Sequence, residues 1–221
     1  MIPLSDIAPE NGLYSLNPAD LGQQNCYKLL IGSVLPRPIA FVSTVSADGI
    51  PNLAPFSFFN AVASNPPSVL FTTTRRGSDG QKKDTLLNIE ATGEFVVNVV
   101  TEEIVEQMNQ TSAEYGRGIS EFTATGLTPI PSDIVKAPRV KESPINMECK
   151  LLQIVEVGDG SLGSGNIIIG EVVRFHLAER VFQNGHVLVE ELKPVARLAG
   201  SGYCPVREVF SLARPVIPET D

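Results

Sequence analysis

The chain has 221 residues, of which 43% are hydrophobic and 19% are charged, and its formal net charge is −8. These values are typical of a globular protein with a substantial core. The acidic balance argues against nucleic acid as a partner, because a phosphate backbone attracts clustered lysine and arginine. No apolar run reaches the roughly 20 residues that a helix needs to cross a bilayer. The N-terminus lacks the basic and apolar regions of a signal peptide, and three widely spaced cysteines indicate neither a disulfide framework nor a metal site. We therefore expect a cytoplasmic protein with no membrane segment and no bound metal.

The first part of the chain leads into a predicted β-hairpin. Residues 1–20 are rich in proline, asparagine and glycine and predict an arm, followed by a short strand or turn at Cys26–Leu30. The hairpin's first leg, 36–45, is almost wholly apolar, as expected of a strand covered on both faces. Its return leg, 52–60, holds a proline among aromatic and small polar residues, which favours a sheet edge or a bulge. This leg could line a flat ligand or belong to the core, and its pattern alone leaves both open.

The rest of the chain alternates predicted strands with few helices. The β-rich runs are 68–74, 94–100, 146–157, 166–179 and 187–189. A first short helix is expected with Asp84 or Thr85 as its N-cap and Gly93 closing it, and a second is expected to open at Thr101, which can cap it. Residues 116–143 predict an irregular flap or interface loop, and a loop-rich tail follows from Arg197. With neither βαβ alternation nor a linker, residues 1–221 predict one domain, mainly β, built as an antiparallel barrel with a few short flanking helices.

One glycine-rich motif is misleading. Gly158–Gly163 matches the GxGxxG pattern of dinucleotide-binding proteins, and a predicted strand precedes it. That fingerprint requires a helix to begin directly afterwards, so that its N-terminus meets the pyrophosphate. The residues that follow, 166–173, are β-branched and extended. The motif therefore predicts a hairpin loop.

Hydroxyl and cationic side chains crowd the region just before the first predicted helix. They are Thr73, Arg75, Ser78, Lys83 and Thr85. A helix N-terminus offers free N–H groups, and arginine presents a fork that matches phosphate oxygens, so the segment could hold a phosphate monoester. The alternative is a solvated charged turn, which is the commoner origin of such a run.

Acid–base machinery is sparse. His176 lies in a predicted strand and His186 in a turn, and neither has a recognisable partner in the sequence. Cys149 lies inside a strand and is expected to be structural, since buried cysteines are usually inert. We therefore assign no catalytic side chain. Chemistry carried by a bound redox cofactor stays open, because it depends on positioning more than on a protein nucleophile.

Several stretches in a fixed order resemble one family, the flavin reductase-like FMN-binding proteins. The nearest branch includes nitrilotriacetate monooxygenase component B and flavoredoxin. The resemblance spans roughly residues 22–215. The stretches that carry it are Arg37–Thr44, Asn52–Phe59, Lys83–Thr85, Glu94–Asn98, Ser143–Pro144 followed by Glu148–Cys149, and Arg197–Gly200 with Tyr203.

The resemblance implies an antiparallel, Greek-key-like split β-barrel that binds FMN, usually as a homodimer with the flavin near the subunit interface. By position, Ser57, Phe58, Phe59 and Asn60 should line the flavin ring and ribityl chain. Thr73, Arg75, Lys83, Asp84 and Thr85 should hold the phosphate, and Arg197 and Tyr203 should close the site. Ala199 and the pair Ser201-Gly202 depart from the family pattern, which weakens the assignment of Tyr203.

The implied activity is that of an NAD(P)H:flavin oxidoreductase. NADH or NADPH would be a transient electron donor, and a monooxygenase or another acceptor would be the partner. The rival is an FMN-binding electron carrier, similar to flavoredoxin, with little NAD(P)H activity. A barrel that has lost flavin is a third reading, against which Lys83, Asp84, Thr85 and Ser57 argue.

Overall fold

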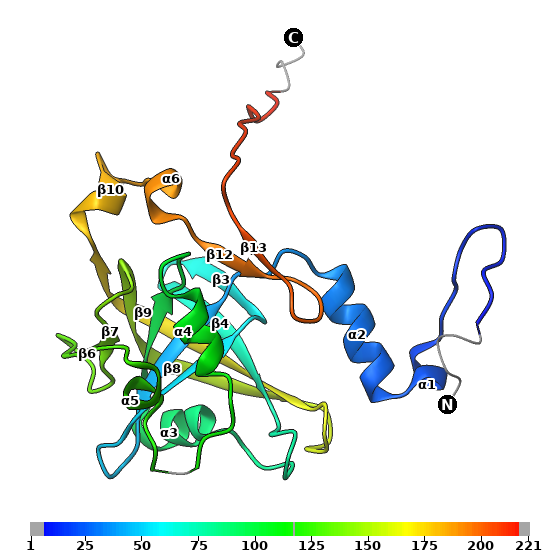
Figure 1. Ribbon diagram of the computed structural model, residues 1–221, viewed down its shortest axis with the longest axis horizontal. Coiled ribbons are helices and arrows are strands. Elements are labelled where there is room, and N and C mark those ends of the chain that lie inside the picture. Colours follow the sequence, from blue (N-terminus) through cyan, green and yellow to red (C-terminus); the bar gives the residue numbers. More distant parts are fainter. Residues whose placement is uncertain (1–6, 117, 217–221) are drawn as a thin grey trace.

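The computed structural model describes residues 7–116 and 118–216. Its centre is a seven-stranded antiparallel sheet in the order β2-β1-β5-β8-β9-β4-β3 (Figure 1). The mainly β, antiparallel architecture expected from the sequence is thereby confirmed. The strands are β1 Ala40–Val45, β2 Pro51–Phe56, β3 Phe59–Ser64, β4 Pro67–Thr74, β5 Glu94–Val99, β8 Ile145–Val157 and β9 Gly165–Leu177.

The sheet curls back on itself into a barrel at the junction of β2 and β3. These strands are consecutive in the chain but form opposite edges of the sheet. The N–H of Thr72 on β4 donates to the carbonyl of Phe58 in the bend between them, at 2.9 Å. The predicted return leg is therefore two edge strands joined by a bend. Pro55 is tolerated in β2 because an edge strand has one side without ladder partners.

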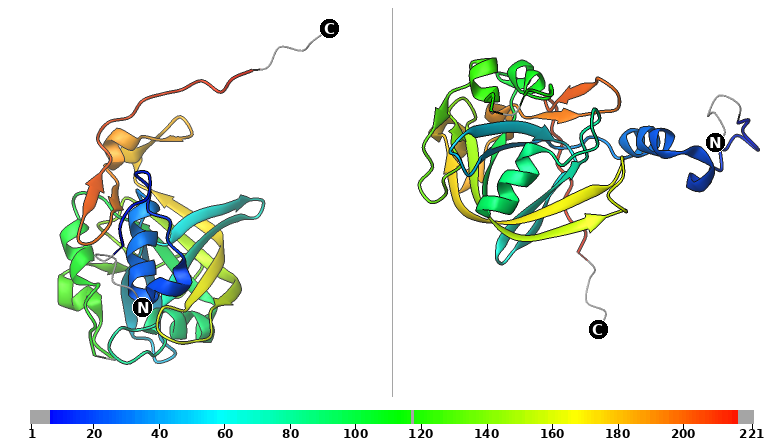
Figure 2. Two further views of the ribbon diagram at one scale, coloured as in Figure 1. Left: turned by 90° about the vertical axis from the view of Figure 1, so that its right-hand side faces the viewer. Right: turned by 90° about the horizontal axis from the view of Figure 1, so that it is seen from below.

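Two apolar cores cover the two faces of β1, which explains why this strand is buried along its whole length. Ala40 and Val42 join the barrel interior, which the helix α3 (Asp84–Thr92) also fills with Leu86 and Ile89. Phe41 belongs to a second cluster outside the barrel, to which α4 (Val105–Gln110) and α5 (Glu121–Thr125) contribute. The β1–β2 pair thus has a helical layer on its outer face, and α3 lies across one end of the barrel (Figures 1 and 2).

The N-terminal part is helical, so the expectation of a short strand or turn at Cys26–Leu30 is wrong. Two helices, α1 (Pro18–Leu21) and α2 (Gln23–Ser33), precede the barrel and project to one side of it (Figures 1 and 2). Glutamine, lysine and leucine in α2 favour a helix. Several apolar side chains of α2 remain exposed, among them Tyr27, Leu29 and Leu30. The predicted arm includes residues 1–6, which lie outside the described residues.

Helix α3 begins earlier in the chain than expected, and helix α4 begins later. Helix α3 ends at Gly93 in the left-handed conformation, as predicted, but its N-cap is Lys83. The Asp84 carboxylate pairs with Arg76, and the Thr85 hydroxyl donates to Asn52, so neither side chain caps the helix. Helix α4 starts at Val105, because Thr101 forms a β-bridge with Pro194.

Short elements complete the chain. Within residues 116–143, α5 and a small hairpin of β6 (Pro129–Ile130) and β7 (Arg139–Val140) replace part of the expected irregular segment. The loop that holds the GxGxxG match joins β8 to β9 as a hairpin, as predicted. No helix among residues 7–116 and 118–216 is long and apolar enough to cross a membrane. The remaining elements are η2 Glu179–Val181, β10 Phe182–Gln183, β11 His186–Val187, α6 Val189–Leu192, β12 Val195–Arg197 and β13 Tyr203–Pro205.

Candidate functional site

Two adjoining cavities form a groove along the edge strand β2. The first, of about 260 Å³, is named here the tail cavity, and the second, of about 80 Å³, the cationic pocket. Pro55 and Ser112 line both, so the two cavities adjoin. The tail cavity is lined by Tyr27, Ile39, Pro55, Ser57, Met108, Asn109, Ser112, Arg197 and Tyr203. The cationic pocket is lined by Asn52, Ala54, Pro55, Arg76, Lys83, Asp84, Thr85, Thr111–Tyr115 and Glu121.

Arg37 fixes one wall of the tail cavity. Its guanidinium is buried and donates to the carbonyls of Ile31 and Val34 at the end of α2, and to that of Leu198 after β12. It also donates to Ser57 Oγ at 3.3 Å, and its Cζ lies 6.0 Å from the centre of the Phe58 ring. Burial lowers the pKa of Arg37, but arginine stays charged in proteins. One buried cation thus joins α2, the β2–β3 bend and the tail around Ser57.

The neighbouring wall comes from the β12–β13 hairpin, where Arg197 forms a β-bridge with Arg37. Arg197 and Tyr203 are register partners, and the Arg197 guanidinium lies 4.5 Å from the centre of the Tyr203 ring. The Tyr203 hydroxyl donates to Asn109 Oδ1 of α4 at 2.8 Å. This arrangement presents an aromatic ring, a cation and an amide at the groove, beside the apolar side chains of Ile39 and Met108.

The cationic pocket lies at the N-terminus of α3. The side chain of its N-cap residue, Lys83, makes no capping hydrogen bond, and the first turn of a helix carries partial positive charge. Lys83 Nζ lies 5.9 Å from the Phe56 ring centre. Burial lowers the pKa of Lys83, Glu114 opposes that shift and Arg76 adds to it. Arg76 also lines the pocket and forms an ion pair with Asp84.

A chain of buried hydrogen bonds holds this helix end against β1 and β2. Thr85 Oγ1 donates to Asn52 Oδ1 at 2.9 Å, and Asn88 Nδ2 donates to Thr44 Oγ1 at 3.0 Å. Asn52 Nδ2 in turn donates to Glu121 Oε1 of α5 at 2.9 Å. Burial raises the pKa of Glu121, although hydrogen bonds partly offset this. The network fixes the direction of α3 toward the groove.

A carboxylate already approaches the cations of the pocket. Glu114 lines the pocket together with Lys83 and Arg76. The pKa of Glu114 is lowered, first by a hydrogen bond from the Ser78 side chain, then by one from the Gly77 backbone and by the charges of Arg76 and Lys83. An anionic oxygen therefore occupies the same electrostatic environment that a phosphate oxygen would need.

The structure gathers six of the eleven predicted site residues at the groove, namely Ser57, Lys83, Asp84, Thr85, Arg197 and Tyr203. Phe58 stands behind Ser57, against Arg37. Phe59 packs on the barrel interior and Asn60 is exposed. Thr73 is fully buried opposite Asn166, and the Arg75 side chain lies against Gly160 of the β8–β9 loop.

Sequence reasoning did not single out several polar residues that line the groove, among them Asn52, Arg76 and Ser112, nor Arg37, which holds Ser57. A signal existed only for Arg37, which is a lone cation in an apolar run. Arg75 and Arg76 are adjacent in the sequence, so the sequence could not show which of them lines the pocket. Both directly follow β4, and the path of the chain after this strand directs their side chains into different environments.

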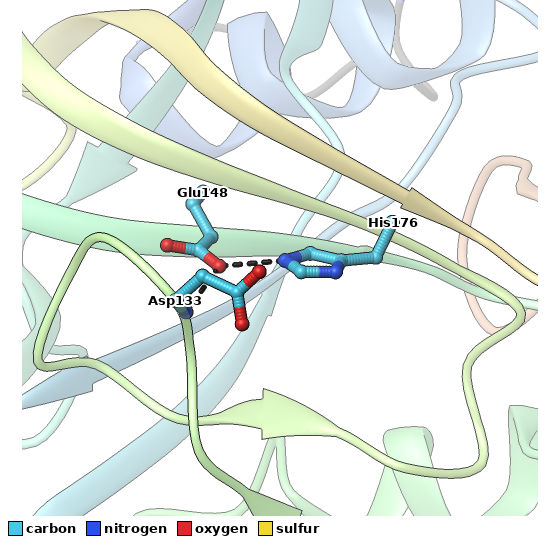
Figure 3. Close-up of side chains that lie close together, drawn as sticks. All are labelled: Asp133, Glu148 and His176. Atoms are coloured by element: carbon cyan, nitrogen blue, oxygen red, sulfur yellow. Dashed lines mark hydrogen bonds and ion pairs between the residues drawn. The ribbon is translucent and has the colours of Figure 1, made fainter.

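A separate cluster of titratable groups lies on the other side of the sheet, where Asp133, Glu148 and His176 meet (Figure 3). Glu148 Oε1 accepts from the Asp133 N–H at 2.7 Å and lies 2.6 Å from His176 Nε2. Its Oε2 accepts from the N–H groups of Ile134 and Val135. We call this set the Glu148 clamp. Burial raises the pKa of Glu148, but these hydrogen bonds outweigh it and lower the pKa to about 2.

The Glu148 clamp has metal-ligating atoms within 4.8 Å of one another, yet its chemistry is that of a structural tie. Each Glu148 oxygen already accepts two N–H groups, so the carboxylate is committed to the protein. The expectation that His176 has no recognisable partner is wrong, because pairing of β8 with β9 brings it diagonally beside Glu148. Cys149, next along β8, is fully buried, and burial raises the pKa of its thiol.

Comparisons with known proteins identify the family. A model of the flavin reductase like domain matches residues 31–194. The structure of nitrilotriacetate monooxygenase component B from Bacillus cereus is 41% identical, with a TM-score of 0.87 over 92% of this chain and 100% of that one. The 2-nitrobenzoate 2-nitroreductase NbaA of Pseudomonas fluorescens is 32% identical, with a TM-score of 0.83 over 94% and 99% of the two chains.

A third structure bears on the fold. A proposed flavin reductase with a split barrel domain from Shewanella frigidimarina is 26% identical, with a TM-score of 0.76 over 89% of this chain and 96% of that one. The fold is therefore a split β-barrel, as the resemblance implied. The chain belongs to the flavin reductase-like family.

Proposed function

We propose that this protein binds FMN in the groove along β2, with the phosphate in the cationic pocket and the flavin ring in the tail cavity. The observation that carries the proposal is that the two cavities adjoin, since Pro55 and Ser112 line both. One end of the groove is cationic and small, and the other is larger and lined by aromatic, apolar and small polar groups. This asymmetry matches a flat ring joined by a chain to a phosphate.

The residues at the cationic end fit a phosphate monoester. Lys83 supplies a partly buried positive charge, and the uncapped start of α3 supplies N–H groups and dipole. Arg76 adds a guanidinium whose direction Asp84 sets. The hydroxyl of Thr85 donates to Asn52, so Thr85 contributes its position at the helix start.

At the other end, Ser57, Arg197 and Tyr203 would contact the ring, with Phe58 behind Ser57. Phe59 and Thr73 pack within the barrel wall, so they would affect FMN binding indirectly, through the position of that wall. Asn60 and Arg75 lie outside both cavities of this protomer, so their contact with FMN is a separate part of the proposal.

The activity we propose is NAD(P)H:flavin oxidoreduction. Bound FMN would supply the hydride-accepting chemistry, and the protein would bind, orient and shield it. No side chain is assigned as a proton donor. We propose a monooxygenase as a partner, in keeping with the nitrilotriacetate monooxygenase component B from Bacillus cereus to which the chain is similar. An FMN-binding electron carrier is the second candidate, favoured by the sparse acid–base groups at the groove.

We further propose that the whole chain forms one flavin-binding domain that acts in the cytoplasm as a homodimer. Exposed apolar side chains on α2 and on the distal part of β8 support a second copy as their cover. They include Leu29, Leu30, Val34, Leu152 and Val157. Because Tyr27 of α2 lines the tail cavity, a partner packed on α2 would lie beside the flavin.

One experiment separates the two activities. Purified protein is examined by visible spectroscopy, and NADH and NADPH oxidation is followed with FMN, FAD or riboflavin added. Rapid oxidation with FMN supports the reductase. A flavin spectrum without NAD(P)H oxidation contradicts the reductase and supports the carrier, and a protein that fails to bind FMN contradicts both.

A further inference from the structure

Two arginines meet at the end of the groove where we place the flavin ring. Arg37 and Arg197 form a β-bridge, and the backbone N–H of each donates to the carbonyl of the other, at 3.0 and 2.8 Å. Like charges directly opposite each other on neighbouring strands are destabilising. Burial lowers the pKa of Arg37, Tyr27 opposes that shift and the charge of Arg197 adds to it. A pairing that costs stability in this way is typical of a functional site.

Among the described residues, the protein offers this arginine pair dipoles and no carboxylate. The Arg37 guanidinium donates to three backbone carbonyls, two of them at the end of α2, and to Ser57 Oγ. The Arg197 guanidinium donates to the carbonyl of Gly200 and lies over the ring of Tyr203. None of the described residues that line the tail cavity is acidic. The ring end of the groove is therefore positively charged, and its cavity leaves space for a negative partner.

Ser57 brings the charge of Arg37 to the surface of the cavity. An arginine can only donate, so Ser57 Oγ accepts in this bond and keeps its own proton for another partner. Within residues 7–116 and 118–216 that hydroxyl donates to no protein acceptor, and Ser57 lines the tail cavity. A hydroxyl that accepts from a cation is polarised and donates more strongly. Because Arg37 itself is buried, it acts on a ligand through Ser57.

From this geometry we propose that the Arg37–Arg197 pair, with Ser57 as the link to Arg37, favours reduced over oxidised flavin in the tail cavity and so raises the reduction potential of the bound cofactor. The proposal rests on the flavin orientation given under the proposed function and adds a means of regulating that site. Arg197 would contact the ring directly. Arg37 is a positioning residue, which fixes the direction in which Ser57 donates.

The charge balance of reduction explains why a positive site discriminates between the two states. A hydride from NADH or NADPH carries two electrons and one proton, so its transfer leaves NAD(P)⁺ and adds one negative charge to the flavin ring. Nearby charges and hydrogen bonds to the ring nitrogens are the means by which a protein tunes a flavin. The ring of oxidised flavin is neutral, so it gains less from the same two arginines.

The arginine pair could also hold a phosphate, which would place FMN in the groove in the reverse direction. The relative sizes of the two cavities favour the first orientation. The cationic pocket, of about 80 Å³, suits the small phosphate, and the tail cavity, of about 260 Å³, suits the ring. Riboflavin, which has the ring and lacks the phosphate, separates the two orientations by experiment.

Removal of one charge from the pair tests the proposal. Arg197→Gln removes the charge and keeps the backbone of the β-bridge, and Arg197→Lys restores the charge. The reduction potential of FMN bound to the full chain is measured by anaerobic equilibration with a reference dye, and fluorescence titration gives the affinity for oxidised FMN. Arg197→Gln should lower the ratio of reduced to oxidised affinity about tenfold, which is about 30 mV for a two-electron couple, and Arg197→Lys should restore most of it. Arg207→Gln, at an exposed arginine that pairs with Glu102, is the control, with a change below about twofold.

Ser57→Ala tests the link to Arg37 and keeps that buried arginine, whose loss would leave three carbonyls without a donor. The same ratio should fall about threefold for both FMN and riboflavin, because the effect acts on the ring. Unchanged potentials in Arg197→Gln and Ser57→Ala would overturn the inference.

Two further outcomes separate this inference from the proposed function. If Arg197→Gln weakens the binding of oxidised FMN and leaves riboflavin unchanged, the phosphate lies at this end, and both the inference and the proposed orientation fail. If FMN binding depends on Lys83 while the potentials stay unchanged, only this inference fails. A wild-type chain that binds no FMN removes the proposed function as well.

Discussion

The Glu148 clamp and the cationic pocket both place a carboxylate beside hydrogen-bond donors. Only in the clamp do groups of the protein supply hydrogen bonds to both carboxylate oxygens. In the clamp, one fully buried carboxylate accepts from three backbone N–H groups and lies against His176. In the pocket, Lys83, Arg76 and an uncapped helix end face a groove, and the exposed Glu114 approaches them from a loop.

The difference separates a structural charge from a binding site. A buried charge with every partner supplied by the protein is expensive to disturb and has no capacity left for a ligand. A positively charged pocket whose nearby carboxylate belongs to an exposed glutamate, here Glu114, can exchange that carboxylate for an external anion. Substitutions of Glu148, Lys83 and Glu114 test this contrast.

Removal of the clamp carboxylate should affect folding and leave ligand binding intact. Glu148→Ala leaves several buried donors without an acceptor, so we expect a loss of about 3–5 kcal/mol in the free energy of unfolding. Urea titration measures this loss, and Glu156→Ala, at an exposed glutamate of the same strand, is the control. A change of FMN affinity in the folded fraction, with stability unchanged, would show that the clamp belongs to a ligand site.

The clamp should also contribute to acid sensitivity. The pKa of Glu148 falls from 4.5 to about 2 on folding. Because the folded pKa is the lower one, its stabilisation is complete above pH 4.5 and is lost as the pH falls from there toward 2. The amount is about 3 kcal/mol. Urea titrations between pH 7 and pH 3 should show about two-thirds of this loss in the wild type and a weaker pH dependence in Glu148→Gln, and identical profiles would refute it.

The cationic pocket should show the opposite behaviour. Lys83→Ala is expected to weaken FMN binding by about 10–100-fold and riboflavin binding by less than about threefold, because only FMN carries the phosphate. Fluorescence titration with both flavins gives the ratio. Lys82→Ala provides a contrast from the neighbouring position, since that ammonium pairs with Glu90 and does not line the pocket. Equal losses for FMN and riboflavin in Lys83→Ala would contradict the phosphate assignment.

The smallest effect is expected from the carboxylate in the pocket. Glu114→Gln removes a negative charge beside Lys83 and Arg76, so FMN should bind about three- to fivefold more tightly, with riboflavin unchanged. Glu106→Gln, at an exposed glutamate on α4 outside the groove, controls for net charge. Weaker FMN binding in Glu114→Gln would mean that Glu114 supports the site and does not compete with the phosphate.

Local patterns predicted much of the barrel. Runs rich in valine, isoleucine and threonine identified β4, β5, β8 and β9. The glycine at position 93 identified the end of α3, where the structure has it in the left-handed conformation. The predictions failed where local propensity was ambiguous or where tertiary contacts determined the start of an element. The segment 23–33 has a helical composition that a short apolar run obscured, and the pairing of Thr101 with Pro194 delays the start of α4.

The class of fold and the cationic character of the helix start follow from local properties of the chain, namely strand propensity, turn residues and the clustering of cations before a helix. Long-range contacts place Arg76, and not Arg75, in one pocket with Lys83, bring Glu148 to His176, and set two cavities beside each other along β2. These facts depend on strand register and on the closing of a sheet whose edges, β2 and β3, are neighbours in the chain. A change of one residue in register would reverse which side chains face the groove.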